Sequence, residues 1–192
     1  MAGTRALVGL WSLVLGVLVS CKPEGEVTSR DLRFTLGHSK GEYCIVDGEL
    51  VGRVLSRSLS AIDPEHYFLQ LALRCRDIRG RRLRVPEECG VTLFTEAPES
   101  RSLWQPEPMV EGSVELFSIG RSVILALDVA SPPQAVVLGK PHLPQVPEVT
   151  MRLRNVRLAK TAPADLRSLM QPMIEKDAAI NTWFQPHAAG SP

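Results

Sequence analysis

The chain has 192 residues, with 22 lysines and arginines against 21 acidic residues and a formal net charge of +1 at pH 7. A balance this close to zero argues against nucleic acid or another bulk polyanion as a partner. With 15 prolines and only 5% aromatic residues, the composition predicts many short elements joined by turns. No cofactor motif, such as a phosphate-binding loop or a dinucleotide fingerprint, is found.

The first 21 residues consist of a short basic start and an apolar run. Arg5 precedes the apolar stretch 6–19, which ends in Leu18-Val19-Ser20-Cys21. This run has the length of a signal-peptide core and is too short for a permanent transmembrane helix, which needs about 20 apolar residues. A small residue before the cysteine suits the narrow cleft of a processing peptidase.

Leu18, Val19, Ser20 and Cys21 resemble the lipobox of bacterial lipoproteins at each position. The resemblance implies that residues 1–20 are a lipoprotein signal peptide and that Cys21 is acylated, with palmitate or a similar fatty acid. A lipoprotein cysteine carries more than one acyl chain, which makes the membrane attachment permanent, whereas one chain holds a protein only marginally. The alternative is an ordinary secretory signal in which the cysteine stands by chance.

The residues after the cysteine predict a short polar tether, residues 21–27, because they include both proline and glycine. In the sorting rule of the lipoprotein family, an aspartate after the cysteine retains the protein in the inner membrane. Lys22 departs from that rule, so the resemblance implies the outer membrane, with the domain exposed to the periplasm. Without residues 1–20, which carry one arginine and no acid, the chain is charge-balanced and long enough for one core.

Several stretches alternate apolar and polar residues with a period of two, which predicts strands. The clearest is Phe68–Cys75, in which Leu69, Leu71, Leu73 and Cys75 share a face. Asp47-Gly48 predicts a hairpin turn. Residues 49–60 fit either a strand or a helix, and we favour the strand. The other predicted strands are Val91–Thr95, Val110–Ser118, Ser122–Val129, Ala135–Leu138 and Val149–Leu158.

Near the end of the chain the apolar spacing changes from two to the helical period. The apolar stripe comprises Leu166, Leu169, Met170, Met173, Ile174, Ile180, Trp183 and Phe184. Residues 163–184 therefore predict an amphipathic helix, which Pro172 should kink or split in two, and residues 185–192 predict a disordered tail. The sequence predicts a mainly β domain over residues 28–184, an antiparallel β-sandwich or half-barrel sheet with a C-terminal helix; an α+β arrangement is the alternative.

Three cysteines remain if Cys21 carries lipid. An exported protein forms disulfides, and we favour Cys75–Cys89, since a hairpin between them would bring both together. Closing a loop of that size contributes about 3 kcal/mol in the chain-entropy model. Cys44 stands in an apolar run and is expected to be a buried, small hydrophobe. The scattered cysteines and histidines predict no metal site.

Residues 37–41 read Gly-His-Ser-Lys-Gly, which matches the G-x-S-x-G pentapeptide of α/β-hydrolases. Asp128 and His142 follow Ser39 in the order that those enzymes use. However, the pentapeptide must open a helix, and residues 42–48 have the pattern of a strand and turn. A serine hydrolase at Ser39 is therefore the least favoured hypothesis, and a glycine-rich turn is the simpler interpretation.

Six arginines crowd into residues 74–84. A hairpin with the loop Ile78–Gly80 places Cys75 opposite Leu83, so that one exposed face gathers Arg74, Arg76, Arg82 and Arg84. Like charges that face each other across a sheet destabilise it, and an anionic partner relieves that repulsion. The partner would be an anionic envelope lipid, a polysaccharide or an acidic envelope protein. The alternative is a solvated face with no partner.

The apolar stripe of the C-terminal helix has two interpretations as well. It completes the core by packing on the sheet, or it forms one wall of a groove that holds lipid. The last forty or so residues are similar to the end of some periplasmic lipoproteins with a half-barrel, lipid-binding fold. We therefore expect a non-enzymatic binding or scaffolding module, with lipid or apolar-ligand binding between sheet and helix as the alternative.

Overall fold

The structure, a computed structural model, describes residues 24–29, 32–58, 69–95, 106–120, 122–131 and 149–185. Within these ranges, ten strands form one sheet and three short helices follow it. The prediction of a mainly β domain with a helical C-terminal region is confirmed. The signal segment with Cys21, the predicted strand Ala135–Leu138, His142 and residues 186–192 lie outside the described residues.

All neighbouring strands of the sheet are antiparallel, and one additional parallel pairing joins β10 to β2. The order is β5-β8-β9-β10-β1-β2-β3-β4-β6-β7. The strands are β1 (Glu24–Ser29), β2 (Leu32–Val46), β3 (Glu49–Ser58), β4 (Leu69–Arg76), β5 (Arg82–Arg84), β6 (Cys89–Thr95), β7 (Glu107–Pro108), β8 (Glu111–Ile119), β9 (Ser122–Ala130) and β10 (Val149–Lys160).

The alternating sequence pattern places the core as predicted. In β4, Leu69, Leu71, Leu73 and Cys75 are all buried. Residues 49–58 form strand β3, so the strand was the right choice for this ambiguous segment. Asp47 and Gly48 connect β2 to β3 with positive φ angles of 50° and 79°, a geometry that an Asp-Gly hairpin turn favours.

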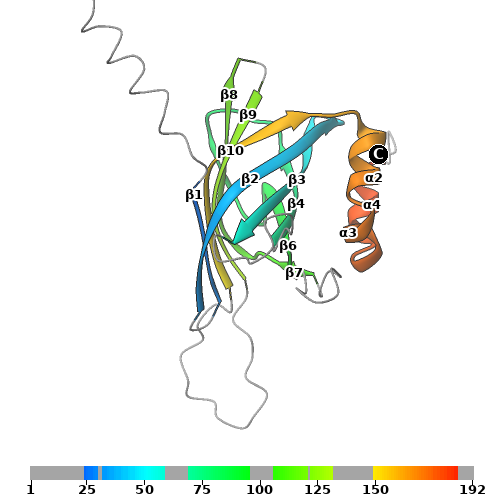
Figure 1. Cartoon of the computed structure of the whole chain (residues 1–192). Coiled ribbons are helices and arrows are strands. Elements are labelled where there is room, and N and C mark those ends of the chain that lie inside the picture. The colour runs from blue at the N-terminus through cyan, green and yellow to red at the C-terminus, as the bar shows by residue number, and fades with distance from the viewer. Residues whose placement is uncertain are drawn as a thin grey trace, which may run out of the picture.

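The sheet is strongly curved and folds over itself into two layers. Figure 1 shows β1, β8, β9 and β10 on one side and β3, β4 and β6 on the other. The larger apolar cluster fills the space between them, with members such as Leu73, Leu93, Leu125 and Leu153. A short segment also links the two ends of the sheet, because the Met109 amide donates to Val91 O and the Val110 amide to Ala130 O.

Strand β2 is 15 residues long and belongs to both layers. The glycine-rich turn predicted at residues 37–41 is wrong, because these residues continue the strand, with a register shift between Gly37 and Lys40. At Gly41 the strand lies against both β3 and β10. A Cβ atom there would lie 2.6 Å from Arg53 O and 2.5 Å from Leu158 Cδ2. The glycine thus serves close packing inside the sheet, not a turn.

The three helices α2 (Pro163–Leu169), α3 (Gln171–Lys176) and α4 (Ala179–Thr182) cover the outer face of the second layer (Figure 1). The prediction of a helix over 163–184, at most split once, is corrected to three segments. Met170 ends α2 and precedes α3, where Pro172 occupies the first turn, a position that needs no backbone N–H. Asp177 is extended and separates α3 from α4.

The helices are held by a second apolar cluster. Its members are Cys44, Val51, Ala72 and Phe94 from the sheet and Leu166, Met170, Met173 and Ile180 from the helices. Each of these side chains is at most 1% exposed. In addition, the Arg53 guanidinium donates a hydrogen bond to Leu169 O at the end of α2. The apolar stripe therefore packs on the sheet.

The predicted tether is shorter than expected, because β1 begins at Glu24 inside it. β1 pairs with β10 on one side and β2 on the other. The acidic Glu24 and Glu26 and the small Gly25 concealed the strand pattern. Gly25 is closely packed there, since a Cβ would lie 2.4 Å from Leu153 Cδ2 and 3.0 Å from Leu36 Cβ. Only Lys22 and Pro23 separate Cys21 from the first strand.

Cys75 and Cys89 lie opposite each other on β4 and β6 and form the predicted disulfide. Cys44 is a buried free thiol, also as predicted, and burial raises its pKa above the ordinary value for cysteine. In the part of the chain described here, no helix combines the length and apolar character that crossing a membrane requires.

Candidate functional site

The predicted arginine hairpin does not form. Arg74 of β4 lies opposite Gly90, whereas β5 pairs with β8, so that Arg82 lies opposite Glu115 and Arg84 opposite Ser113. The disulfide-linked pairing of β4 with β6 occupies the edge of β4 that the hairpin would have used. The four arginines Arg74, Arg76, Arg82 and Arg84 therefore do not share one face in the predicted register.

Acidic side chains neutralise most of this arginine-rich segment. The ion pairs are Arg74–Glu49, Arg79–Asp77, Arg81–Glu88, Arg82–Glu115 and Arg84–Glu88. A hydrogen bond from the Arg84 amide, together with the nearby Arg81 and Arg84 charges, lowers the pKa of Glu88. The hydrogen bond to Asp77 is the main cause of a raised pKa for Arg79. These pairs relieve the repulsion without an external anion.

Two of the four predicted residues, Arg74 and Arg76, line a hollow of about 260 Å³ beside the disulfide. Trp183 from the end of the helical region forms part of its wall. Its lining also contains the carboxylates Glu49, Glu87 and Glu88. Because carboxylates outnumber guanidinium groups here, this hollow does not suit an anion.

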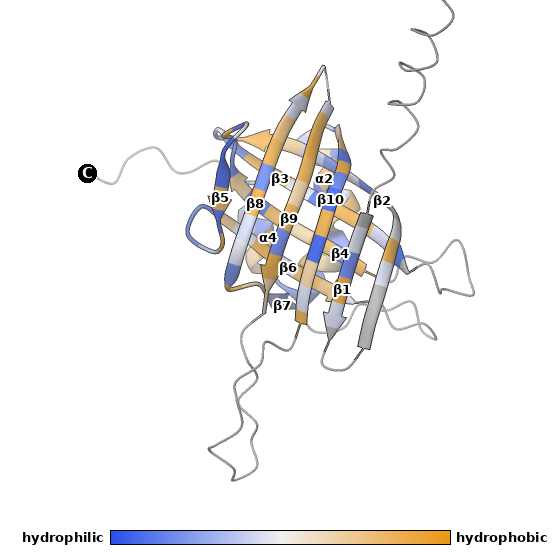
Figure 2. Ribbon diagram, turned by 90° about the vertical axis from the view of Figure 1, so that its left-hand side faces the viewer, coloured by the Kyte–Doolittle hydropathy of each residue, from blue (hydrophilic) through white to orange (hydrophobic). Residues whose placement is uncertain are grey.

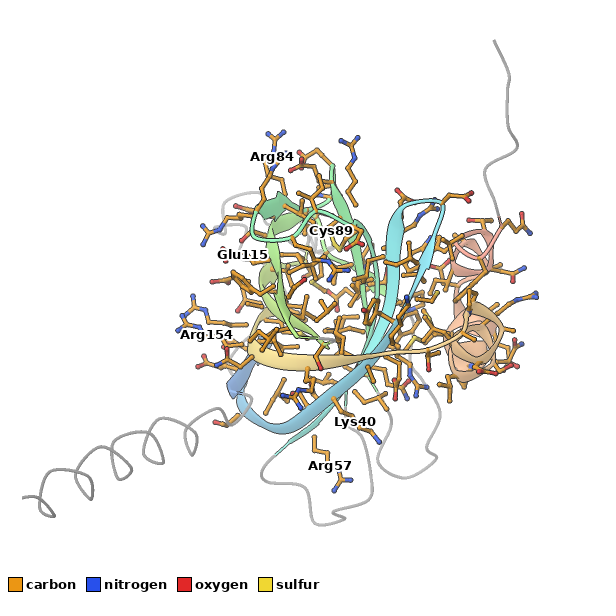
Figure 3. The ribbon with its side chains drawn as sticks, turned by 90° about the horizontal axis from the view of Figure 1, so that it is seen from above. Lys40, Arg57, Arg84, Cys89, Glu115 and Arg154 are labelled. Atoms are coloured by element: carbon orange, nitrogen blue, oxygen red, sulfur yellow. A yellow bond between two sulfur atoms is a disulfide. The ribbon has the colours of Figure 1, made fainter. Side chains whose placement is uncertain are left out.

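A second hollow, also of about 260 Å³, lies on the outer face of β8, β9 and β10, and we call it the β8–β10 hollow. Its charged and polar lining comprises Arg82, Ser113, Glu115, Asp128, Arg152, Arg154 and Asn155. Figure 2 faces this layer and shows hydrophilic colour across the middle of these strands. In Figure 3, Arg154 and Glu115 lie on the side of the sheet away from the helices.

A β-bulge shapes this hollow. The pairing of β10 with β9 shifts register between Leu153 and Val156. Asn155 adopts a left-handed backbone conformation with φ of 58°, which asparagine tolerates better than most residues. The bulge places two consecutive exposed residues, Arg154 and Asn155, on the solvent side of β10. Bulges often re-aim side chains in this way beside binding sites.

Arg154 differs from its arginine neighbours in the hollow. The Arg152 guanidinium pairs with Asp128, with an Nη2–Oδ2 distance of 2.7 Å, and Arg82 Nε lies 2.7 Å from Glu115 Oε1. Arg154 is exposed and has no ion pair among the described residues. The hollow thus carries three guanidinium groups and two carboxylates, with one guanidinium available to an anion.

Sequence reasoning missed this site, although its signal is present. The apolar positions Val149, Met151 and Leu153 alternate, but the next apolar positions are Val156 and Leu158. The phase changes across Arg154 and Asn155, which marks an extra residue in the strand.

The hydrolase pattern lacks its structural context. Ser39 lies within β2 and not at a strand-to-helix turn, and its hydroxyl is 2.7 Å from the hydroxyl of Ser56. Asp128, the proposed acidic partner, pairs with Arg152 on the outer face of the sheet. Residues 37–41 therefore do not form the strained elbow that exposes a nucleophilic serine.

No group of three or more potential metal ligands occurs among the residues that the structure describes. Comparisons of the chain with protein-family models, with curated proteins and with solved structures found no match.

Proposed function

We propose that this protein is a bacterial envelope lipoprotein, anchored to the outer membrane through acylated Cys21, whose β domain is a non-enzymatic binding or scaffolding module. The β8–β10 hollow is its recognition surface and takes an anionic group of an envelope component. The single observation that carries the binding role is the exposed Arg154 guanidinium, which lies at the bulge beside the ion pairs Arg152–Asp128 and Arg82–Glu115. The anchoring role rests on residues 18–21.

The charges of the hollow support an anionic ligand. Arg152 and Arg82 are partly committed to Asp128 and Glu115, but each guanidinium has five N–H donors and retains some for a ligand. Arg154 offers a full fork of donors, which matches phosphate or carboxylate oxygens. The Asn155 amide and the Ser113 hydroxyl supply neutral hydrogen-bonding groups at the same place.

Membrane anchoring makes modest affinity sufficient. Partners in the same membrane meet the domain at a raised effective concentration. An exposed charged site, which is screened by salt, binds weakly in solution. Such a site on an anchored module is suited to holding neighbours together in an assembly.

The first experiment tests the anchor. Cells that produce the full chain are grown with labelled palmitate, and the mature protein is examined by mass spectrometry. We expect label on the wild-type protein, an N-terminal residue Cys21 with attached acyl chains, and loss of the label in Cys21→Ser. An unmodified N-terminus in the wild-type protein would overturn the proposal of a lipoprotein.

The second experiment tests the hollow with tripolyphosphate as an anionic probe, titrated into the lipid-anchored protein at low salt. Arg154→Gln should weaken binding by about tenfold or more, because a charge-assisted hydrogen bond contributes about 1.5–3 kcal/mol. Arg167→Gln, an exposed change on α2 outside this hollow, is the control and should leave binding unchanged. Equal affinities of all three proteins would contradict an anion site at Arg154.

The alternative of an apolar ligand between sheet and helices has less support. The side chains of that interface are packed against each other and buried. A ligand there would require the helices to separate from the sheet. Serine hydrolysis at Ser39 has less support still, because the serine shares its hydrogen bond with Ser56 inside a strand.

A further inference from the structure

The hairpin between β8 and β9 carries exposed apolar side chains near its tip. Phe117 is 39% exposed. Ile119 is 61% exposed, more than any other large hydrophobic residue among those described. Ile124 lies opposite Phe117 on β9 and is half-buried. Large apolar side chains exposed together indicate an interaction surface. The question is what covers the tip.

The direction of the strands answers that question. β1 and β9 are both antiparallel to β10, so they run parallel to each other and start at the same end of the sheet. β9 starts directly after the hairpin tip, at Ser122, and β1 starts at Glu24, three residues after Cys21. In Figures 1 and 2, the start of β1 and the hairpin tip point toward the same end of the domain.

The strand register gives the distance by which the hairpin tip and Cys21 each extend beyond Glu24. Glu24 lies opposite Arg154, in the bulge whose flanking residues Leu153 and Val156 pair with Leu127 and Leu125. The pair Glu115 and Ala126 is level with Glu24, so the tip at Gly120 is about five strand residues beyond Glu24, or roughly 17 Å at 3.4 Å per residue. The three steps from Glu24 back to Cys21 span at most about 10 Å.

The tip thus extends roughly 7 Å beyond the reach of Cys21. Interfacial protein segments bury their apolar side chains about 5–10 Å into the boundary between headgroups and acyl chains. If the modified Cys21 lies at the membrane surface, the tip reaches that boundary.

We propose that the tip of the β8–β9 hairpin inserts into the interfacial region of the same bilayer that holds the acyl chains of Cys21. This inference rests on the proposed lipid anchor and adds a second membrane contact. Two contacts at one end hold the domain in one orientation, whereas a lipid alone allows it to tilt.

The charges near the tip agree with a phospholipid surface. Arg157 of β10 is exposed and lies opposite Ile124 of β9. Arg79 donates to the Ser118 hydroxyl beside the tip. Among the described residues of the hairpin from Leu116 to Ile124, none is acidic. Arginines around an apolar tip suit anionic headgroups.

The test uses the acylated full-length protein in vesicles of phosphatidylethanolamine and phosphatidylglycerol, with or without brominated acyl chains. Ile119→Trp introduces a fluorophore at the tip, and the native emission, recorded for the unsubstituted protein, is subtracted. We expect brominated lipid to reduce the added emission, because a side chain buried at the boundary between headgroups and acyl chains lies close to the bromine atoms. Phe117→Trp is a second tip variant with the same expected result.

Val110→Trp is the matched control, because Val110 is 43% exposed and lies just before the opposite end of β8. Its emission should not respond to bromine. Equal emission of the tip variants with and without brominated lipid would overturn the hairpin proposal. That result leaves the anchor intact, because acylation of Cys21 is measured separately by mass spectrometry on the same samples.

Discussion

Gly112→Ala is expected to lower the free energy of unfolding by about 3 kcal/mol or more, the largest effect we expect at any glycine described here. A Cβ atom on Gly112 would lie 2.1 Å from Asp128 O and 2.7 Å from Val129 Cα. Both contacts are with the backbone of β9, which has no flexible side chain to move aside. The φ of +124° at Gly112 is also one that an alanine rarely adopts. Denaturant unfolding of the purified protein measures the change.

Two other glycines separate the effect of a positive φ from the effect of a close backbone contact. Gly120 has a positive φ of 59° but open space around a Cβ, so Gly120→Ala should cost only about 1 kcal/mol. For Gly90 the nearest atom to a Cβ is Arg74 O at 3.9 Å, an ordinary contact, so Gly90→Ala should have almost no effect. If Gly112→Ala lowered the free energy of unfolding no more than Gly120→Ala, the close approach of β8 to the β9 backbone at Gly112 would be contradicted.

Phe94→Ala should lower the free energy of unfolding by about 3–5 kcal/mol, as for other buried phenylalanines. Phe94 is fully buried and belongs to the cluster between the sheet and the helices. Its loss leaves a cavity in the interface that holds α2, α3 and α4. The helices should therefore separate from the sheet more often than in the wild-type protein.

The Cys44 thiol reports that separation, because it is buried in the same cluster. Its reaction with a thiol reagent under native conditions should accelerate in Phe94→Ala. Phe117→Ala is the control, since Phe117 is 39% exposed and lies on the other layer. It should change neither the stability nor the labelling rate by much. Equal labelling rates for Phe94→Ala and the wild-type protein would mean that the helices are held by contacts elsewhere.

Much of the fold was predictable because its signals are local. Alternating residues in β8 and β9 reveal one buried face, and Asp47-Gly48 determines its turn through backbone conformation alone. The predicted pairing of Cys75 with Cys89 is right, but the cysteines meet on the neighbouring strands β4 and β6 and not across the predicted hairpin.

The errors arose where a local pattern depends on distant partners. Residues 74–84 predicted an arginine hairpin on their own, but β4 pairs with β6 and β5 pairs with β8. Gly41 resembles a turn residue until β10 is known to pass within contact of it. β1 was concealed because the role of Gly25 is visible only once Leu153 of β10 and Leu36 of β2 are known to lie against it.

The candidate site depends on the same kind of information. The phase change at Arg154 and Asn155 is visible in the sequence, but Arg82, Asp128 and Arg152 come from three separate strands. That Arg154 has no ion pair among the described side chains follows only from that arrangement.

Strand β2 contributes its first part to one layer and its last part to the other, where it also contacts β10 in parallel. Both layers therefore share the continuous backbone of β2. Removal of either layer would cut β2 and leave the other layer with an unpaired strand edge. The two layers are therefore expected to unfold together as one cooperative unit.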